Sequence, residues 1–136
     1  MLHFSRKSIT ELETVHPSLK LVMTEALRVE LIDFSIIQGH RGKAEQDRYF
    51  SLDKSKVRFP NGKHNSMPSL AVDAAPYIRY KLSWDKRHCI FLAGVILTCA
   101  KNLGIGLRWG GNWDRDLEPI TDQDFQDLVH YELTEV

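Results

Sequence analysis

The chain has 136 residues, of which 43% are hydrophobic and 26% charged, with 18 basic and 18 acidic side chains. This composition is typical of one folded domain and excludes a disordered segment. A formal net charge of zero gives no electrostatic footprint for nucleic acid or for an anionic membrane surface, so we expect neither partner.

The N-terminus, the longest apolar run and the cysteines all favour a protein made in a cytoplasm. The first residues lead into polar side chains, whereas a secretion signal needs an apolar core of about 7–15 residues. The longest apolar run, residues 90–97, is too short to cross a bilayer, which takes about 20 residues. Cys89 and Cys99 fall on one predicted helix and would lie about 15 Å apart at about 1.5 Å per residue, beyond the reach of a disulfide. Free thiols suit a reducing compartment, so we expect no signal peptide and no membrane span.

The first predicted elements are a helix and a strand. Apolar residues recur at helical spacing over residues 17–31, which predicts an amphipathic helix that begins with a proline. Residues 34–38 are rich in β-branched and aromatic side chains and are followed by Gly39, which predicts a short strand. His40 and Arg41 directly follow this predicted strand and its glycine.

A long polar loop separates the next two elements. Residues 43–50 predict a short helix, and residues 51–69 carry the prolines and glycine typical of a loop. The apolar stretch 70–72 then predicts a short central strand that ends before Pro76, with Asp73 at its end. A carboxylate in that place must be desolvated unless it is paired, caps a turn or binds a metal ion.

The second half of the chain begins with the longest predicted helix. Residues 85–102 have apolar positions along one face, an aspartate as the first residue to cap them, and a stop at Gly104. Strands are predicted at residues 106–109 and 129–133, with a capped helical turn over residues 121–124 between them. Together these elements predict the α+β fold of a single small domain, with an antiparallel sheet packed against helices.

Four side chains are the most informative set in the sequence, because they supply three possible zinc ligands and one spare carboxylate: His64, Asp73, Asp127 and His130. Catalytic zinc takes three protein ligands and keeps a fourth position open, and a general base must stand beside the reactive water. Spacing alone leaves the four interchangeable. His64 could also be a solvated loop histidine, Asp73 a cap of the next turn and Asp127 a surface residue of a helical turn. The stronger local metal motifs, such as His-Glu-x-x-His and Cys-x-x-Cys, are absent from the sequence.

Four segments in a fixed order resemble a known family: residues 34–41 with Gln46, residues 63–73, residues 108–113 and residues 127–133. They are similar to zinc peptidases of the D-alanyl-D-alanine carboxypeptidase/VanY type. More narrowly, they resemble the small phage endolysins of that family, which cleave the L-alanyl-D-glutamate bond of peptidoglycan. The resemblance covers nearly the whole chain and implies that residues 1–136 form a single zinc peptidase domain with its metal site at the sheet face.

The resemblance assigns roles to the site residues. It places one catalytic zinc ion on His64, Asp73 and His130, and it makes Asp127 the catalytic acid and base. Arg41 matches the arginine that holds the substrate and stabilises the transition state. Gln46 matches the glutamine that follows this arginine and is expected to bind substrate.

Three further residues are expected near the site from their position in the sequence. Trp109 and Trp113 could form walls of the substrate cleft around a glycine turn, although a place in the core is equally compatible with Trp109. Glu132 should share a strand face with His130, where it could orient that imidazole. It is also the second candidate for the catalytic base.

The sequence departs from the common family pattern in two places. Gly62 stands where the family has serine two residues before the histidine, and nine positions separate His64 from Asp73, an interval that an enlarged loop at residues 66–68 explains. Asp127 is the base where the carboxypeptidases usually have glutamate, which favours the endopeptidase branch.

The function implied by the resemblance is that of a bacteriophage endolysin. Such a hydrolase would degrade the cell wall by cutting the L-alanyl-D-glutamate bond of the stem peptide, and it would act as a monomer with antimicrobial activity. It would wait in the host cytoplasm and reach the peptidoglycan at lysis. Two alternatives stay open, namely a D-alanyl-D-alanine carboxypeptidase or dipeptidase that uses the same zinc site, and a non-catalytic cell-wall-binding domain.

Overall fold

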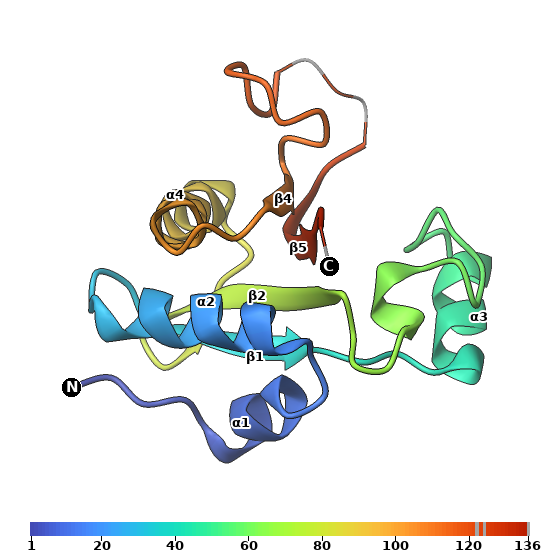
Figure 1. The fold of residues 1–136 in the computed structure, drawn as a ribbon, viewed down its shortest axis with the longest axis horizontal. Coiled ribbons are helices and arrows are strands. Elements are labelled where there is room, and N and C mark those ends of the chain that lie inside the picture. Colours follow the sequence, from blue (N-terminus) through green and yellow to red (C-terminus); the bar gives the residue numbers. More distant parts are fainter. Residues whose placement is uncertain (122, 124, 136) are drawn as a thin grey trace.

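Helices and strands alternate along the chain in the computed structural model, which describes residues 1–121, 123 and 125–135. In chain order the elements are α1 (Arg6–Leu12), α2 (Pro17–Arg28), β1 (Phe34–Gln38), α3 (Lys43–Ser51), the 3-10 helix η1 (Lys63–Asn65), β2 (Ala71–Ile78), β3 (Lys81–Leu82), α4 (Lys86–Asn102), β4 (Leu107–Gly110) and β5 (Asp127–Leu133). Figure 1 shows α2 and α4 beside the strands, with α3 beyond the end of β1.

The strands of the described residues form one antiparallel sheet in the order β1-β2-β5-β4, and β3 adds to β2. The pairing between β2 and β5 sets Asp73 directly opposite His130. The pairing between β1 and β2 sets Gln38 opposite Asp73. The predicted α+β class with an antiparallel sheet is therefore confirmed.

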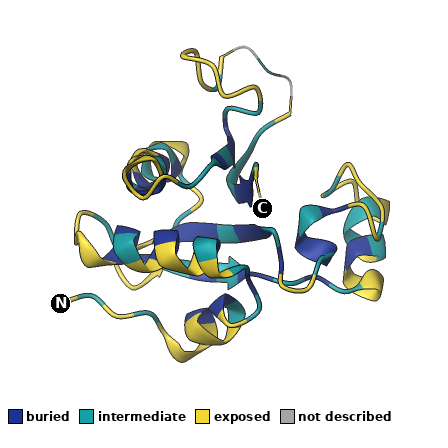
Figure 2. Cartoon of the chain, viewed as in Figure 1, coloured by how far each residue is buried: buried dark blue, intermediate teal, exposed yellow. Residues whose placement is uncertain are grey.

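The two faces of the sheet differ in chemistry because side chains alternate along each strand. Val72 and Tyr131 are buried in the same hydrophobic cluster as residues of α2 and α4. Asp73 and His130 point to the opposite face, which carries the polar side chains. Helix α4 packs against β2, β4, β5 and α2, and Figure 2 shows the helices turning their buried sides inward.

The predicted start of β5 and the predicted end of β2 are both wrong. Strand β5 begins at Asp127, two residues before the predicted start, so Asp127 lies on the strand and not on a helical turn. Strand β2 does not end before Pro76 but continues to Ile78, so Asp73 lies within the strand.

Pro76 is tolerated because of its position in the ladder. The backbone N–H of Tyr77 donates to Asp33 on the β1 side, so the nitrogen of Pro76 faces the other edge. Strand β5 does not pair with β2 at that point, because the last β2–β5 pair is Asp73 with His130. The missing N–H of Pro76 therefore breaks no hydrogen bond between β2 and β5.

Helix α1 and strand β3 were not predicted from the sequence. Helix α1 is relevant to the site because it lies against β1, where the Ser8 hydroxyl accepts a hydrogen bond from the Ile36 N–H at 2.9 Å.

The helical turn predicted over residues 121–124 includes residues 122 and 124, which lie outside the described residues. Cys89 and Cys99 are buried and free, as expected. No helix in the described part of the chain has the length and apolar character needed to cross a bilayer.

Candidate active site

Three of the residues singled out in the sequence meet on the open face of the sheet. Asp73 and His130 are neighbours across β2 and β5, and His64 comes from η1. One possible ligand atom from each residue lies within 4.8 Å of the other two. His64 Nε2 is 3.1 Å and His130 Nδ1 is 3.3 Å from the same carboxylate oxygen, Oδ1 of Asp73. The structure thus brings the three predicted ligands together.

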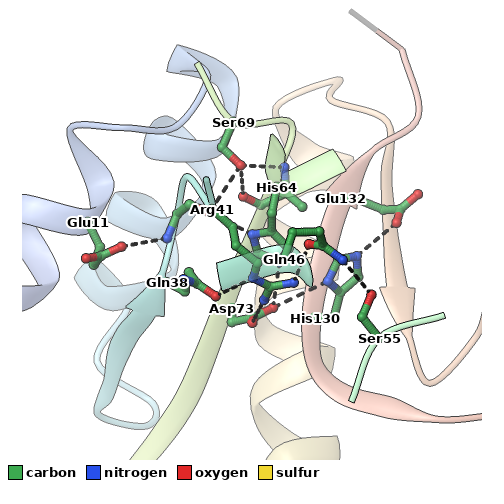
Figure 3. Close-up of polar contacts among 12 residues, drawn as sticks. Glu11, Gln38, Arg41, Gln46, Ser55, His64, Ser69, Asp73, His130 and Glu132 are labelled. Carbon is green, nitrogen blue, oxygen red and sulfur yellow. Dashed lines mark hydrogen bonds and ion pairs between the residues drawn. The ribbon is translucent and has the colours of Figure 1, made fainter. Parts of the chain in front are cut away.

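The second nitrogen of each imidazole is held by a group that can only accept a hydrogen bond. His64 Nδ1 is 2.7 Å from the Gly39 carbonyl, and His130 Nε2 is 2.8 Å from the Glu132 carboxylate. These nitrogens therefore carry the protons. In the neutral rings that a metal requires, His64 Nε2 and His130 Nδ1 then direct lone pairs towards Asp73 (Figure 3). Two oriented imidazoles and one carboxylate are a donor set that fits a catalytic zinc ion.

The charges of the three groups are strongly coupled. Burial alone would raise the pKa of Asp73, but the facing imidazoles of His64 and His130 hold it well below its ordinary value. Burial lowers the pKa of His130, and its hydrogen bonds to Asp73 and Glu132 outweigh this effect and raise the pKa to about 9. In the absence of metal, a proton on His130 therefore balances part of the negative charge that a cation would otherwise balance.

Arg41 is fixed beside the three ligands and is only 6% exposed. Its Nε donates to Gln38 at 2.8 Å and one terminal nitrogen donates to Gln46 at 3.1 Å. The other terminal nitrogen lies 3.6 Å from Asp73 Oδ2, and the guanidinium covers the Tyr49 ring at 4.2 Å. A guanidinium has five N–H donors, which is more than these contacts use.

Gln46 is fully buried, and protein groups engage both ends of its amide. The oxygen accepts hydrogen bonds from Arg41 and Asn65, and the nitrogen donates to Ser55 at 2.9 Å and to the Val57 carbonyl at 2.7 Å. This side chain therefore supports Arg41 and the segment around Ser55.

The two acidic residues of β5 have different surroundings. Burial raises the pKa of Asp127, and the negative charge of Asp73 raises it further. Burial also raises the pKa of Glu132, but its hydrogen bond with His130 and the charges of Lys63 and Arg108 bring it below the ordinary value. One Glu132 oxygen contacts His130, and the other lies 3.3 Å from Arg108 and 3.8 Å from Lys63. Glu132 is therefore committed to internal partners as a stable anion.

A cavity of about 590 Å³ opens over these groups. Its lining includes most of the residues expected to act in the site: Arg41, Gln46, His64, Asp73, Trp113, Asp127, His130 and Glu132. The Trp113 ring lies 5.5 Å from the His130 ring and stacks on Phe125 at 6.0 Å, so it forms one wall.

Trp109 lies outside this lining. It is 4% exposed, belongs to the hydrophobic core and donates its indole N–H to the Leu128 carbonyl at 2.9 Å. The strand register explains this position, because Trp109 pairs with Tyr131, whose side chain is on the core face. Trp109 was expected either in the wall of the cleft or in the core, and it lies in the core.

Two residues that support the site were not identified from the sequence. Gln38 binds Arg41, and Asn65 donates to the Arg41 carbonyl at 3.0 Å and to Gln46 at 3.2 Å. The sequence did contain a signal for Gln38. It is a polar residue at a position of the apolar strand where the alternation of side chains predicts burial. Asn65 directly follows His64 but has no pattern of its own that distinguishes it from a loop residue.

Comparisons with known proteins agree on one family. A family model described as phage L-alanyl-D-glutamate peptidase matches residues 1–134. The L-alanyl-D-glutamate peptidase of Escherichia phage T5 is 33% identical over 112 residues, which cover 82% of this chain and 81% of that protein. The crystal structure of the Serratia marcescens L-Ala D-Glu endopeptidase ChiX has a TM-score of 0.78 and 28% sequence identity, and the match covers 98% of this chain and 90% of that one.

Proposed function

Because the chain belongs to the phage L-alanyl-D-glutamate peptidase family, we propose that it is an endolysin that hydrolyses the L-alanyl-D-glutamate bond of the peptidoglycan stem peptide. The structural observation that supports this proposal is the convergence of His64, Asp73 and His130 in a cavity that also holds Asp127 and Arg41. The set contains a metal site, a titratable carboxylate and a cation, which are the groups that amide hydrolysis needs.

His64, Asp73 and His130 would hold one zinc ion. When bound, zinc supplies Lewis acidity, which lowers the pKa of a coordinated water from about 15.7 towards about 7. Glu132 accepts the hydrogen bond from His130 and keeps the ring turned so that its other nitrogen faces Asp73. The Gly39 carbonyl does the same for His64.

Asp127 would accept the proton of the attacking water and pass it to the leaving amine. The raised pKa of its carboxyl suits both transfers, because a base that later acts as an acid works best with a pKa close to the working pH. Glu132, the second candidate base, is occupied by His130, Arg108 and Lys63, so we assign it to orientation.

Arg41 would donate hydrogen bonds to the oxygen of the scissile carbonyl as negative charge develops there. Gln38 and Gln46 hold its guanidinium in place before the substrate arrives. Since both ends of the Gln46 amide are bound by protein groups, we assign Gln46 to positioning Arg41 in place of direct substrate binding. Trp113 would form the wall of the substrate cleft beside His130.

The alternatives make different products. A D-alanyl-D-alanine carboxypeptidase or dipeptidase could use the same ligands, and a wall-binding domain would cut no bond. The names of the related proteins favour the endopeptidase, and the complete set of ligands with a neighbouring carboxylate favours an active enzyme. We further propose that the protein acts as a monomer on the wall of its host at lysis.

The test of the metal site is zinc content measured together with activity. Purified protein should contain about one zinc ion per chain, and a chelator should abolish the release of amino groups from peptidoglycan. His64→Ala should lower both zinc content and activity. His3→Ala, which changes an exposed histidine away from this cavity, should lower neither. Full activity of a zinc-free protein would refute the proposed mechanism.

A further inference from the structure

Basic side chains in the cavity fall into two groups. The first group is already neutralised by contacts within the site. Arg41 pairs with Asp73, and the Lys63 ammonium donates to the Leu133 carbonyl at 2.7 Å and lies 3.8 Å from Glu132. These two cations balance the acidic groups of the site itself.

The second group consists of Lys54 and Lys56, which line the same cavity from the segment after α3. Within the described part of the chain, the Lys54 ammonium has no hydrogen-bond or ion-pair partner. Lys56 lies 3.4 Å from Asp53, whose side chain is 86% exposed. An ion pair this exposed to water contributes little, so a ligand can compete for this lysine as well.

Hydrogen bonds from the buried Gln46 side chain hold this segment against the site. Gln46 accepts from Arg41 and donates to the Ser55 hydroxyl (Figure 3). It also donates to the Val57 carbonyl, so its two donor contacts lie on either side of Lys56. Ser55 and Val57, the neighbours of Lys56, are therefore linked through the buried Gln46 side chain to the guanidinium that contacts Asp73.

The lysine segment also meets the opposite wall. The Lys56 ammonium lies 5.3 Å from the centre of the Phe125 ring, which stacks on Trp113. Trp113 is the ring that lies beside His130. The charge of Lys56 therefore lies in the cavity lining close to the wall formed by Phe125 and Trp113.

The substrate of the proposed function carries a negative charge close to the bond that is cut. A glutamate residue has two carboxyl groups, and only one of them can continue the peptide. The other is ionised at neutral pH, because its ordinary pKa is about 4.3. It lies within a few bonds of the scissile nitrogen, so the cations that could bind it are those in the cavity lining that the acidic groups of the site do not already hold. Lys54 and Lys56 meet this condition, because neither contacts Asp73, Asp127 or Glu132 within the described part of the chain.

We propose that Lys54 and Lys56 form a carboxylate subsite, which binds the free carboxylate of the D-glutamate residue on the leaving side of the bond. This inference rests on the proposed function and adds a specificity to it. The enzyme discriminates between stem peptides with a free glutamate carboxylate and those in which that group is amidated. Amidation removes the charge and replaces an acceptor oxygen with a donor, which the two ammonium groups cannot bind.

The test uses two synthetic muramyl peptides that differ only in this group, one with a carboxylate and one with a carboxamide. The wild-type enzyme should show kcat/KM about tenfold higher for the carboxylate, the usual scale of one charge-assisted hydrogen bond. In the double variant Lys54→Gln with Lys56→Gln, the ratio should fall to about one, mainly through KM. Lys20→Gln changes an exposed lysine of α2 outside the cavity, and it should keep the wild-type ratio.

Using a ratio removes the effect of inactive or unfolded protein, because both substrates are tested on one preparation. A wild-type ratio near one, or a tenfold ratio that survives in the double variant, would overturn the carboxylate subsite and leave the proposed function intact. Failure of the wild-type enzyme to cut either peptide would overturn the proposed function and this subsite with it.

Discussion

At the scale of single residues, the proton transfer proposed for Asp127 is separate from the zinc binding proposed for His64, Asp73 and His130. Asp127→Asn keeps the size of the side chain but removes its ability to accept a proton at neutral pH. We predict that kcat falls by about 10²–10⁴, the usual contribution of a general acid or base, while zinc content is unchanged. Kinetic assays and metal analysis of the same preparation test this. An Asn variant with full activity would remove Asp127 from the mechanism.

Arg41 is the second residue whose role can be separated from metal binding. We predict that Arg41→Ala lowers kcat by about 10²–10³, the cost of one lost donor to a developing oxyanion, with zinc still bound. Arg41→Lys should restore little activity, because a single ammonium cannot contact Gln38, Gln46 and Asp73 with the geometry of a planar guanidinium. Arg87→Ala, which changes an exposed arginine on α4, is the matched control. Loss of zinc from the Arg41 variants would contradict this division of roles.

His130 gives a prediction for the metal-free protein. Its folded-state pKa, about 9, lies above the ordinary value of 6.5, so the folded state binds the proton more tightly than the unfolded state. The resulting stability, on the order of 3 kcal/mol, is fully present below pH 6.5 and is lost as the pH rises through about 9. Thermal unfolding of chelated protein between pH 6 and pH 10 should show this loss, and His130→Asn should not show it. The same loss of stability in the variant would exclude His130 as its source.

At the scale of elements, α1 and the turn after it hold the end of β1, which carries Gly39. The Gly39 N–H donates to the Glu11 carboxylate at 2.9 Å, and the His40 N–H donates to the Thr14 hydroxyl at 2.8 Å. The Gly39 carbonyl then orients His64. Helix α1 therefore supports the orientation of His64 through Gly39.

This arrangement leaves no space for a side chain at Gly39. A Cβ there would overlap the Thr14 hydroxyl and lie 2.6 Å from the Glu11 carbonyl oxygen. We predict that Gly39→Ala lowers the free energy of unfolding by about 1–3 kcal/mol and weakens zinc binding by about 10–100-fold. Denaturant unfolding and competition with a chromophoric chelator measure the two effects. Gly42→Ala is the matched control, since a Cβ at Gly42 meets nothing within 4 Å. Equal behaviour of the two variants would contradict the supporting role of α1.

The elements also show what could be predicted from sequence and what could not. Strand β1 and helix α4 were predicted because each has a clear apolar period and a residue that ends it. Helix α1 was missed because it spans 7 residues, too few to show a helical period. The position of Trp109 depends on its pairing with Tyr131, a register between distant strands that no local pattern contains.

At the scale of the whole molecule, the site exists only after the sheet has formed. Asp73 and His130 are brought opposite each other by the pairing of β2 with β5, and His64 reaches them from the loop before β2. Most of the site residues that were predicted from the ordered motifs line the cavity, but the motifs did not place Trp109 in the core or identify Gln38 and Asn65. The distances between the site residues, the hydrogen bonds that orient the imidazoles and the ion pairs that occupy Glu132 could not be predicted, because each depends on tertiary contacts.

The proposed function is decided by which bond the protein cuts in a defined muropeptide whose stem begins with L-Ala-D-Glu and ends with D-Ala. Mass spectrometry of the products should show N-acetylmuramyl-L-alanine and a peptide that begins with D-glutamate. Release of a terminal D-alanine in their place would mean that the protein is a carboxypeptidase. An unchanged muropeptide in the presence of zinc would mean that it is not a peptidase for this substrate.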